Sequence, residues 1–194
     1  MARPLLTVGH GTASQADLTR LFVEAGVTQL VDVRRYPSSR AHPHVNREAL
    51  AQWLPAEGID YRWEERLGGR RRLLTESADP WWRVAAFRAY AQHMRSVEFV
   101  AAMNGLFTQL ASTTTSVMCS ETLWWRCHRR LIADFATLVS GIQVRHLTHD
   151  GRLADHPVAA GARLSSEGLL YYDLADGSEW KTDPGNESRI RPTC

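Results

Sequence analysis

The chain has few cysteines, and it lacks any long apolar segment. Three cysteines among 194 residues, an odd number in a chain with no apolar leader after Met1, favour a reducing compartment over a disulfide framework, so we expect a cytoplasmic protein. No apolar run approaches the ~20 residues that a membrane-spanning helix needs, and we therefore expect no membrane partner. No segment repeats at the period of a solenoid, which argues against repeat architectures.

Lysine is almost absent, because Lys181 is the only lysine among 23 basic residues. The formal net charge is only +2. Arginine favours planar, bidentate contacts with carboxylates and phosphates. A GC-rich coding sequence explains the same bias, so only the positions of individual arginines bear on function.

Short apolar runs alternate with segments of helical periodicity along most of the chain. Strands are expected at residues 5–9, 30–33, 60–63, around 117–118 and at 144–147. Helices are expected at residues 18–25, 46–58, 81–94, 97–111 and 127–140. The alternation predicts one α/β domain over residues 1–150, an open and mostly parallel sheet with helices on both faces in Rossmann-like or flavodoxin-like layers. Residues 151–194 are expected to form a small C-terminal extension, a hairpin and a loose tail that pack on the domain or are partly disordered.

Polar residues follow several of these strands. Gly9 ends the first strand, and His10 and Thr12 follow it. The stretch "MCSETLWWRCHRR" begins at Met118 in the fourth strand and continues beyond it. Because parallel strands end at one edge of a sheet, where open α/β sheets bind ligands, we expect such residues to converge. The expected cleft is lined by Gly9, His10, Arg34, Cys119, Glu121, Cys127 and Arg129. The segment "TVGHGT" lets backbone N–H groups approach an anion, but it lacks the spacing of a dinucleotide fingerprint or a P-loop.

Five segments together resemble one known family. They are "TVGHGT", "LVDVRRYPSSR", "LGGRRR", "FRAYAQHM" and "MCSETLWWRCHRRLIAD", in this order and at this spacing. Over about residues 5–150 they are similar to the DUF488 family of bacterial and archaeal proteins. The resemblance implies little about chemistry, because the function of that family is unknown. Two features depart from the family pattern: Trp124 stands where proline is expected, and the extension beyond Asp150 is additional.

Cys119 is the first candidate for a catalytic residue. A strand end near a helix N-terminus and cationic side chains favours the thiolate, which is a good nucleophile. His10 or His128 would serve as the base, and the protein would be a cysteine-dependent hydrolase or transferase. The spacing from Cys119 to Arg126 does not fit a phosphatase-type loop. The alternative is that Cys119 only packs as a small buried side chain at the end of a strand.

Cys127 allows further interpretations. It is expected near Cys119, so the two thiols would form a redox pair, or a nucleophile with a resolving partner. Alternatively, Cys119, Cys127 and His128 would bind zinc or iron, with His10 as an additional candidate ligand. The spacing lacks the close cysteine pair of ordinary zinc knuckles, so we expect no cofactor and no metal. Cys194, the third cysteine, is expected to be an exposed bystander.

Two acidic residues at the same edge have alternative roles. Glu121 would hold the guanidinium of Arg129 or Arg34 through paired hydrogen bonds, or it would act as a general acid or base. Asp32 allows the same two roles, with Arg34 or Arg40 as its ion-pair partner.

Arginine and aromatic residues near this edge predict an anion site. The expected binding residues are Gly9, Thr12, Asp32, Arg34, Arg40, Arg70, Trp125, His128 and Arg129. Arginine combined with stacking aromatic rings is typical of nucleotide and single-stranded nucleic-acid sites. The expected partner is therefore a nucleotide, a nucleic acid or a phosphorylated or carboxylated metabolite. The tryptophans would alternatively fill the core beside the strand–helix junction.

Two classes of function remain open. The first is an enzyme that acts on an anionic substrate, with Cys119, Glu121, His10 and Cys127 as the candidate catalytic residues. The second is a non-catalytic nucleic-acid or effector-binding protein, in which the cysteine cluster is structural or holds a metal. A thiol, an acid and an imidazole at one edge favour the enzyme, because phosphate binding alone needs only arginine.

Overall fold

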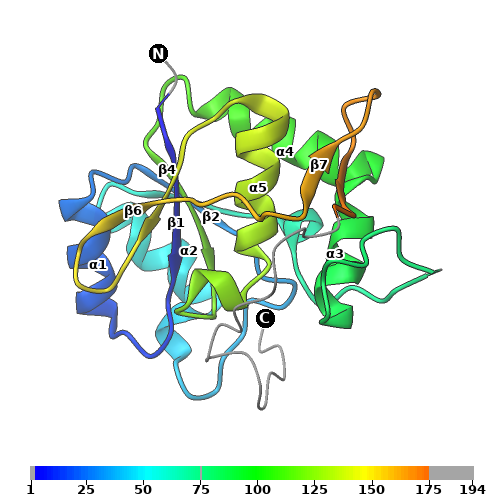
Figure 1. Cartoon of the computed structure of the whole chain (residues 1–194). Coiled ribbons are helices and arrows are strands. Elements are labelled where there is room, and N and C mark those ends of the chain that lie inside the picture. Colours follow the sequence, from blue (N-terminus) through cyan, green and yellow to red (C-terminus); the bar gives the residue numbers. More distant parts are fainter. Residues whose placement is uncertain (1–2, 75, 175–194) are drawn as a thin grey trace.

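A six-stranded sheet forms the centre of the computed structural model, which describes residues 3–74 and 76–174 (Figure 1). Its strands are β1 (Leu5–Gly9), β2 (Gln29–Asp32), β3 (Asp60–Trp63), β4 (Thr115–Cys119), β5 (Val144–Leu147) and β6 (Leu153–Asp155). The strand order is β3-β2-β4-β1-β5-β6; the pair β5–β6 is antiparallel and the other pairs are parallel. The expected α/β fold with an open, mostly parallel sheet is confirmed.

Helices cover both faces of the sheet. They are α1 (Gln15–Glu24), α2 (Arg47–Ala56), α3 (Ala85–Met94), α4 (Val97–Gln109) and α5 (Arg129–Ser140). The connections through α1 and α2 run toward β3, whereas those through α3, α4 and α5 run the opposite way. Since parallel crossovers are right-handed, this reversal places α1 and α2 on one face and the other three helices on the other. No helix in the described ranges is both long and apolar enough to cross a membrane.

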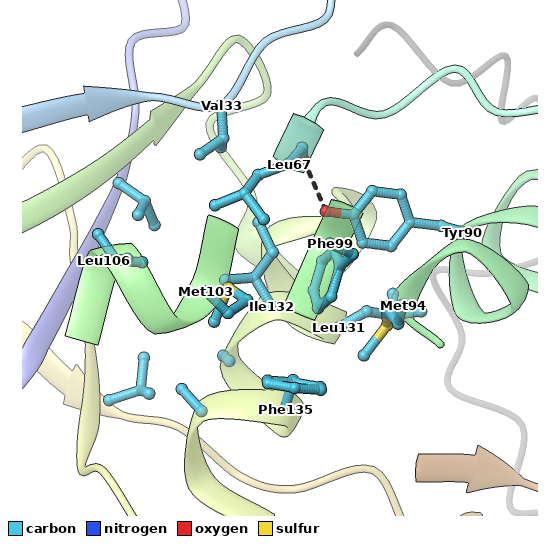
Figure 2. Packing of buried hydrophobic residues seen from close by; sticks show 14 of the residues in the cluster. Val33, Leu67, Tyr90, Met94, Phe99, Met103, Leu106, Leu131, Ile132 and Phe135 are labelled. Carbon is cyan, nitrogen blue, oxygen red and sulfur yellow. Dashed lines mark hydrogen bonds between the residues drawn. The ribbon is translucent and has the colours of Figure 1, made fainter. Parts of the chain in front are cut away.

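The larger core lies between the sheet and helices α3, α4 and α5 (Figure 2). Phe99, Met103 and Leu131 are completely buried in it. The ring of Tyr90 is buried in this core, and its hydroxyl donates a hydrogen bond of 2.6 Å to the backbone carbonyl oxygen of Leu67. This bond attaches the segment after β3 to α3.

Local signals explain where several elements begin and end. Ser14 and Asp17 form a reciprocal capping box at the start of α1. Gly141 ends α5 in the left-handed conformation, with φ of 63°. Asn46 occupies the N-cap position of α2, but its side chain accepts a hydrogen bond of 2.6 Å from the Ser39 N–H and so holds the preceding loop.

The position of β4 between β1 and β2 creates a topological switch point. The chain leaves β1 toward the face of α1, and it leaves β4 toward the face of α5. Gly9 at the end of β1 is the direct neighbour of Cys119 at the end of β4. In open α/β sheets, ligands bind outside the carboxyl ends of the strands at such a point.

The C-terminal extension adds a strand to the sheet and a hairpin to the core. β6 pairs with β5, and β7 (Ala162–Leu164) forms a separate hairpin with β8 (Leu170–Tyr172). Tyr172 is completely buried, and its hydroxyl donates to the Asp134 carboxylate of α5 at 2.9 Å. The expected loose tail and Cys194 fall in residues 175–194, which lie outside the described residues.

Replacing Tyr172 by Phe is expected to lower the free energy of unfolding by about 1–2 kcal/mol, because the buried Asp134 carboxylate loses a hydrogen-bond donor. Tyr171→Phe is the matched control. Its half-buried ring lies 4.4 Å from the guanidinium of Arg95, a contact that phenylalanine keeps. Urea unfolding measures both variants, and equal stability of the two would contradict the role assigned to the Tyr172 hydroxyl.

Candidate functional site

The candidate site residues lie at one edge of the sheet but on two faces. Val33 and Cys119 pack in the core beside α3, α4 and α5. Because successive side chains of a strand point to opposite faces, Asp32 points toward α1 and α2, and so does His10, two residues after Val8. The residues expected in one cleft therefore form two groups. We call them the sulfur cluster (Cys119, Cys127 and His128) and the arginine cluster (Asp32, Arg34 and His10).

Three soft donor atoms converge in the sulfur cluster. The Nδ1 atom of His128 lies 3.5 Å from Sγ of Cys127 and 3.9 Å from Sγ of Cys119. The three ligand atoms all lie within 4.8 Å of one another. Cys119, Cys127 and His128 are only 0%, 1% and 4% exposed. They meet because Cys119 ends β4 and the other two residues immediately precede α5.

His128 is held in one orientation by its surroundings. Its Nε2–H donates to the backbone carbonyl oxygen of Val33 at 3.0 Å, and its ring packs against Tyr90 with centroids 4.9 Å apart. Burial by itself favours the neutral imidazole, but the thiolate forms of Cys127 and Cys119 and their hydrogen bonds outweigh it and raise the pKa of His128 to about 10. An imidazolium at His128 and a thiolate beside it therefore stabilise each other.

The glycine pair of "LGGRRR" lies against the sulfur cluster. A Cβ at Gly69 would be 2.9 Å from Nδ1 of His128, and a Cβ at Gly68 would be 2.8 Å from Cα of Arg35. Both distances are too short for a side chain, so the turn requires glycine at both positions. The absence of these side chains brings the turn directly against the edge of the imidazole that faces the sulfurs.

The arginine cluster is a buried ion pair joined to a histidine. Arg34 donates from Nε and Nη2 to the Asp32 carboxylate at 2.5–3.1 Å, as expected for this pair. Its Nη2 also donates to the carbonyl oxygen of Val45 at 2.6 Å, and its Nη1 lies 3.3 Å from Nε2 of His10. The Nδ1–H of His10 donates to the Gly11 carbonyl at 2.9 Å, so both ring nitrogens are engaged. Burial and the Arg34 charge lower the pKa of His10 to about 4.

Arg129 and Glu121 meet through the backbone. Arg129 is buried, and its Nη2 donates to the backbone carbonyl oxygen of Glu121 and, at 3.4 Å, to that of Thr122. The Glu121 carboxylate accepts a hydrogen bond from the Leu123 N–H at 3.2 Å. The guanidinium of Arg129 thus fixes the loop after β4. Gly9 lets this loop cross β1, since a Cβ there would lie 1.9 Å from the Glu121 carbonyl oxygen.

The other residues expected to bind an anion lie on the surface. Thr12 and Arg40 are exposed, and Trp125 is 43% exposed. Arg70 is exposed as well, with its guanidinium 5.9 Å from the centre of the Tyr36 ring.

Two further arginines adjoin the sulfur cluster. The backbone of Arg35 lies against Gly68, and Arg126 directly precedes Cys127. Their side chains make no hydrogen bond or ion pair with any residue in the part of the chain that the structure describes. Among the described residues they differ in this from Arg34 and Arg129, whose donors bond to protein groups.

A buried hydrogen-bond chain, not predicted from the sequence, connects β1 with the C-terminal extension. Thr7 Oγ1 lies 2.7 Å from Nδ1 of His146, and Nε2 of that ring lies 3.0 Å from Nδ1 of His156. Nε2 of His156 lies 2.8 Å from the Asp134 carboxylate. The half-buried ring of Trp124 stacks on His146 with centroids 4.1 Å apart and covers this chain. A histidine inside the apolar strand "VRHL" was the signal available in the sequence.

Comparison with protein families matches residues 16–136 to the family described as "Domain of unknown function DUF488". The chain belongs to the DUF488 family. The resemblance found in the sequence motifs is therefore confirmed. No curated protein and no solved structure matches the chain.

The DUF488 match contains the whole sulfur cluster, the glycine pair and the ion pair of Asp32 with Arg34. His10 and His146 lie outside the matched residues. The matched residues thus include the ends of β2 and β4 but not the end of β1.

Lowering the pH is expected to destabilise this DUF488 protein below about pH 6.5. Burial, then the charges of His156 and Arg129, lower the pKa of His146 to about 3, and the pKa of His10 is about 4. Between these values and the ordinary value near 6.5 the unfolded chain binds more protons at these two histidines, so their contribution to stability is complete above that range and is lost as the pH falls. At pH 5 each of these two histidines lowers the free energy of unfolding by about 2 kcal/mol relative to its value at neutral pH.

Urea unfolding at pH 7.5 and pH 5 measures this loss. His146→Asn keeps a donor and an acceptor for the neighbouring groups but does not titrate, so its stability should change less with pH than that of the wild type. An equally steep loss in His146→Asn would contradict a neutral, buried His146.

Proposed function

We propose that the chain is a cysteine-dependent enzyme, a hydrolase or transferase, that acts on an anionic substrate at the carboxyl edge of the sheet. The observation that carries the proposal is the contact of His128 Nδ1 with Sγ of Cys119, 3.9 Å apart, at the topological switch point. A thiol beside an imidazole is the pair that nucleophilic catalysis by cysteine needs. His10 points to the other face of the sheet and has both ring nitrogens engaged, so His128 is the base.

Cys119 supplies the nucleophile in this proposal. The Nδ1 atom of His128 already holds the thiol proton near neutral pH, and the thiolate sulfur attacks the electrophilic carbon or phosphorus atom of the substrate. The leaving group departs with the bonding electron pair and receives the proton from the imidazolium. Water cleaves the covalent intermediate in a hydrolase, or a second substrate accepts the group in a transferase. The hydrogen bond from Nε2–H to the Val33 carbonyl holds the ring in place throughout.

The arginines beside the sulfur cluster support an anionic substrate. The guanidinium groups of Arg35 and Arg126 have no partner among the described residues, and such groups bind phosphate and carboxylate through paired hydrogen bonds. Arg34 and Arg129, the arginines favoured from the sequence, already donate to protein groups. The substrate class remains that of nucleotides, nucleic acids and small phosphorylated or carboxylated molecules, and the exposed ring of Trp125 is suited to stacking on a base.

The rate at which iodoacetamide labels Cys119 is expected to change little between about pH 6 and pH 8, because the His128 imidazolium supports the thiolate over this range. In His128→Asn the rate should rise about tenfold per pH unit, as for an ordinary thiol. Peptide mass spectrometry assigns the label. His93→Asn is the control, since His93 also packs against Tyr90 but bonds to the Arg66 carbonyl.

Labelling of Cys127 alone would show that Cys119 is not the nucleophile. If the labelling rate depended on pH in the same way in the wild type and in His128→Asn, His128 would not be the partner of the thiol.

The double variant Arg35→Gln with Arg126→Gln is expected to bind anions at least about tenfold more weakly than the wild type, because it loses two guanidinium groups that bond to no described residue. Calorimetry with inorganic phosphate, ATP and a short single-stranded oligonucleotide measures the affinities. Arg3→Gln is the control, because this exposed arginine bonds to Thr114 at the opposite edge of the sheet. Equal losses in the control and the double variant would show a general charge effect and contradict a site at Arg35 and Arg126.

A further inference from the structure

The S···N distances within the sulfur cluster are close to those between ligands of a tetrahedral zinc ion. Zinc binds thiolate sulfur at about 2.3 Å and imidazole nitrogen at about 2.0 Å, so its ligands lie about 3.5 Å (S···N) and about 3.8 Å (S···S) apart. The observed S···N distances to Nδ1 of His128 are 3.5 Å for Cys127 and 3.9 Å for Cys119. The three atoms all lie within 4.8 Å of one another, so the two sulfurs would need to approach each other by at most about 1 Å to hold such an ion.

The orientation of His128 is also that of a metal ligand. Its Nε2–H is bonded to the carbonyl oxygen of Val33 at 3.0 Å, so in the neutral ring the lone pair is on Nδ1 and faces both sulfurs. Histidine ligands usually donate their second ring N–H to a carbonyl or carboxylate in this way. A side chain at Gly69 would come within 2.9 Å of the same nitrogen, so only glycine fits beside it.

We infer that the sulfur cluster also binds a soft divalent cation such as Zn²⁺, which replaces the protons shared by its three ligand atoms. The side chains of Cys119, Cys127 and His128 share two protons besides the Nε2–H, either one on each sulfur or one on a sulfur and one on Nδ1. Binding releases both protons and leaves two thiolates and a neutral imidazole on the metal. In the described residues no further histidine, cysteine or carboxylate joins these three ligands, so water or a substrate anion completes the tetrahedron.

The metal-bound form masks the thiols. A thiolate that donates to zinc is less available for alkylation or attack, so protons and metal ions compete for the same centre. This consequence rests on the proposed function for the role of Cys119, whereas metal binding itself does not depend on it.

The test uses the full chain, reduced and freed of metal with a chelator. Calorimetry with ZnCl₂ at pH 7 in two buffers of different ionisation enthalpy is expected to show one Zn²⁺ per chain, a Kd below about 1 μM and release of about two protons. Binding should also protect Cys119 and Cys127 from iodoacetamide and raise the Tm. Co²⁺ provides an independent readout, because tetrahedral thiolate coordination gives strong visible absorption.

Loss of a ligand is expected to weaken Zn²⁺ binding at least about 100-fold in Cys119→Ser, Cys127→Ser and His128→Asn. Cys194→Ser and His93→Asn are the controls and should bind as the wild type does. Cys127→Ala provides a second variant if serine at this buried position prevents folding, and circular dichroism checks the fold of each protein.

The inference is overturned if the folded wild type fails to bind Zn²⁺, if Cys127→Ala binds it as tightly as the wild type, or if Cys194→Ser loses the binding. Alkylation of the metal-free protein tests the proposed function separately. Tight Zn²⁺ binding together with unchanged alkylation in His128→Asn would support the metal site and reject the thiol enzyme. Alkylation that depends on His128 without any Zn²⁺ binding would support the thiol enzyme and reject the metal site.

Discussion

Strand β4 pairs with β1 on one side and with β2 on the other, and the arrangement of the whole carboxyl edge depends on this position. It sets Cys119 beside Gly9, where the chain leaves neighbouring strands toward opposite faces. Because Gly9 has no side chain, the loop after β4 crosses directly over β1, and Arg129 donates back to its carbonyl groups. The short loop then returns Cys127 and His128 to the end of β4, where sulfur and nitrogen meet.

The segment "VDVR", residues 31–34, makes contacts on both faces of the sheet. Asp32 and Arg34 bond to each other on the side of α1 and α2, whereas the Val33 carbonyl holds His128 on the other side. Removing one partner of a buried ion pair is strongly destabilising, because the other charge is left without compensation. Asp32 and Arg34 already compensate each other. The arginine cluster therefore orders the end of β2, and through Val33 it positions the imidazole beside Cys119 without contacting the sulfurs.

Most of the strands and helices were predicted from hydrophobic periodicity. The strands at residues 5–9, 60–63 and 144–147 have the expected boundaries, because each is a short run that ends at a turn residue or a cap. The helix expected from residue 81 begins only at Ala85, since Trp82 packs against Tyr172 of the C-terminal hairpin. The pairing of β6 with β5 was not expected, because strand addition from a Gly- and Asp-rich segment depends on backbone groups that leave little trace in side-chain pattern.

The sequence by itself determined the alternation of strands and helices, the family and the proximity of two cysteines and a histidine at one strand end. Only the tertiary structure decided which of these side chains share a face, because a shift of one residue along a strand reverses the direction of a side chain. It therefore separated His10 and Arg34 from Cys119 and turned Arg129 toward a backbone carbonyl. The chain from Thr7 to Asp134 through two histidines also belongs to the tertiary structure, because its hydrogen bonds join residues 10 to 139 positions apart.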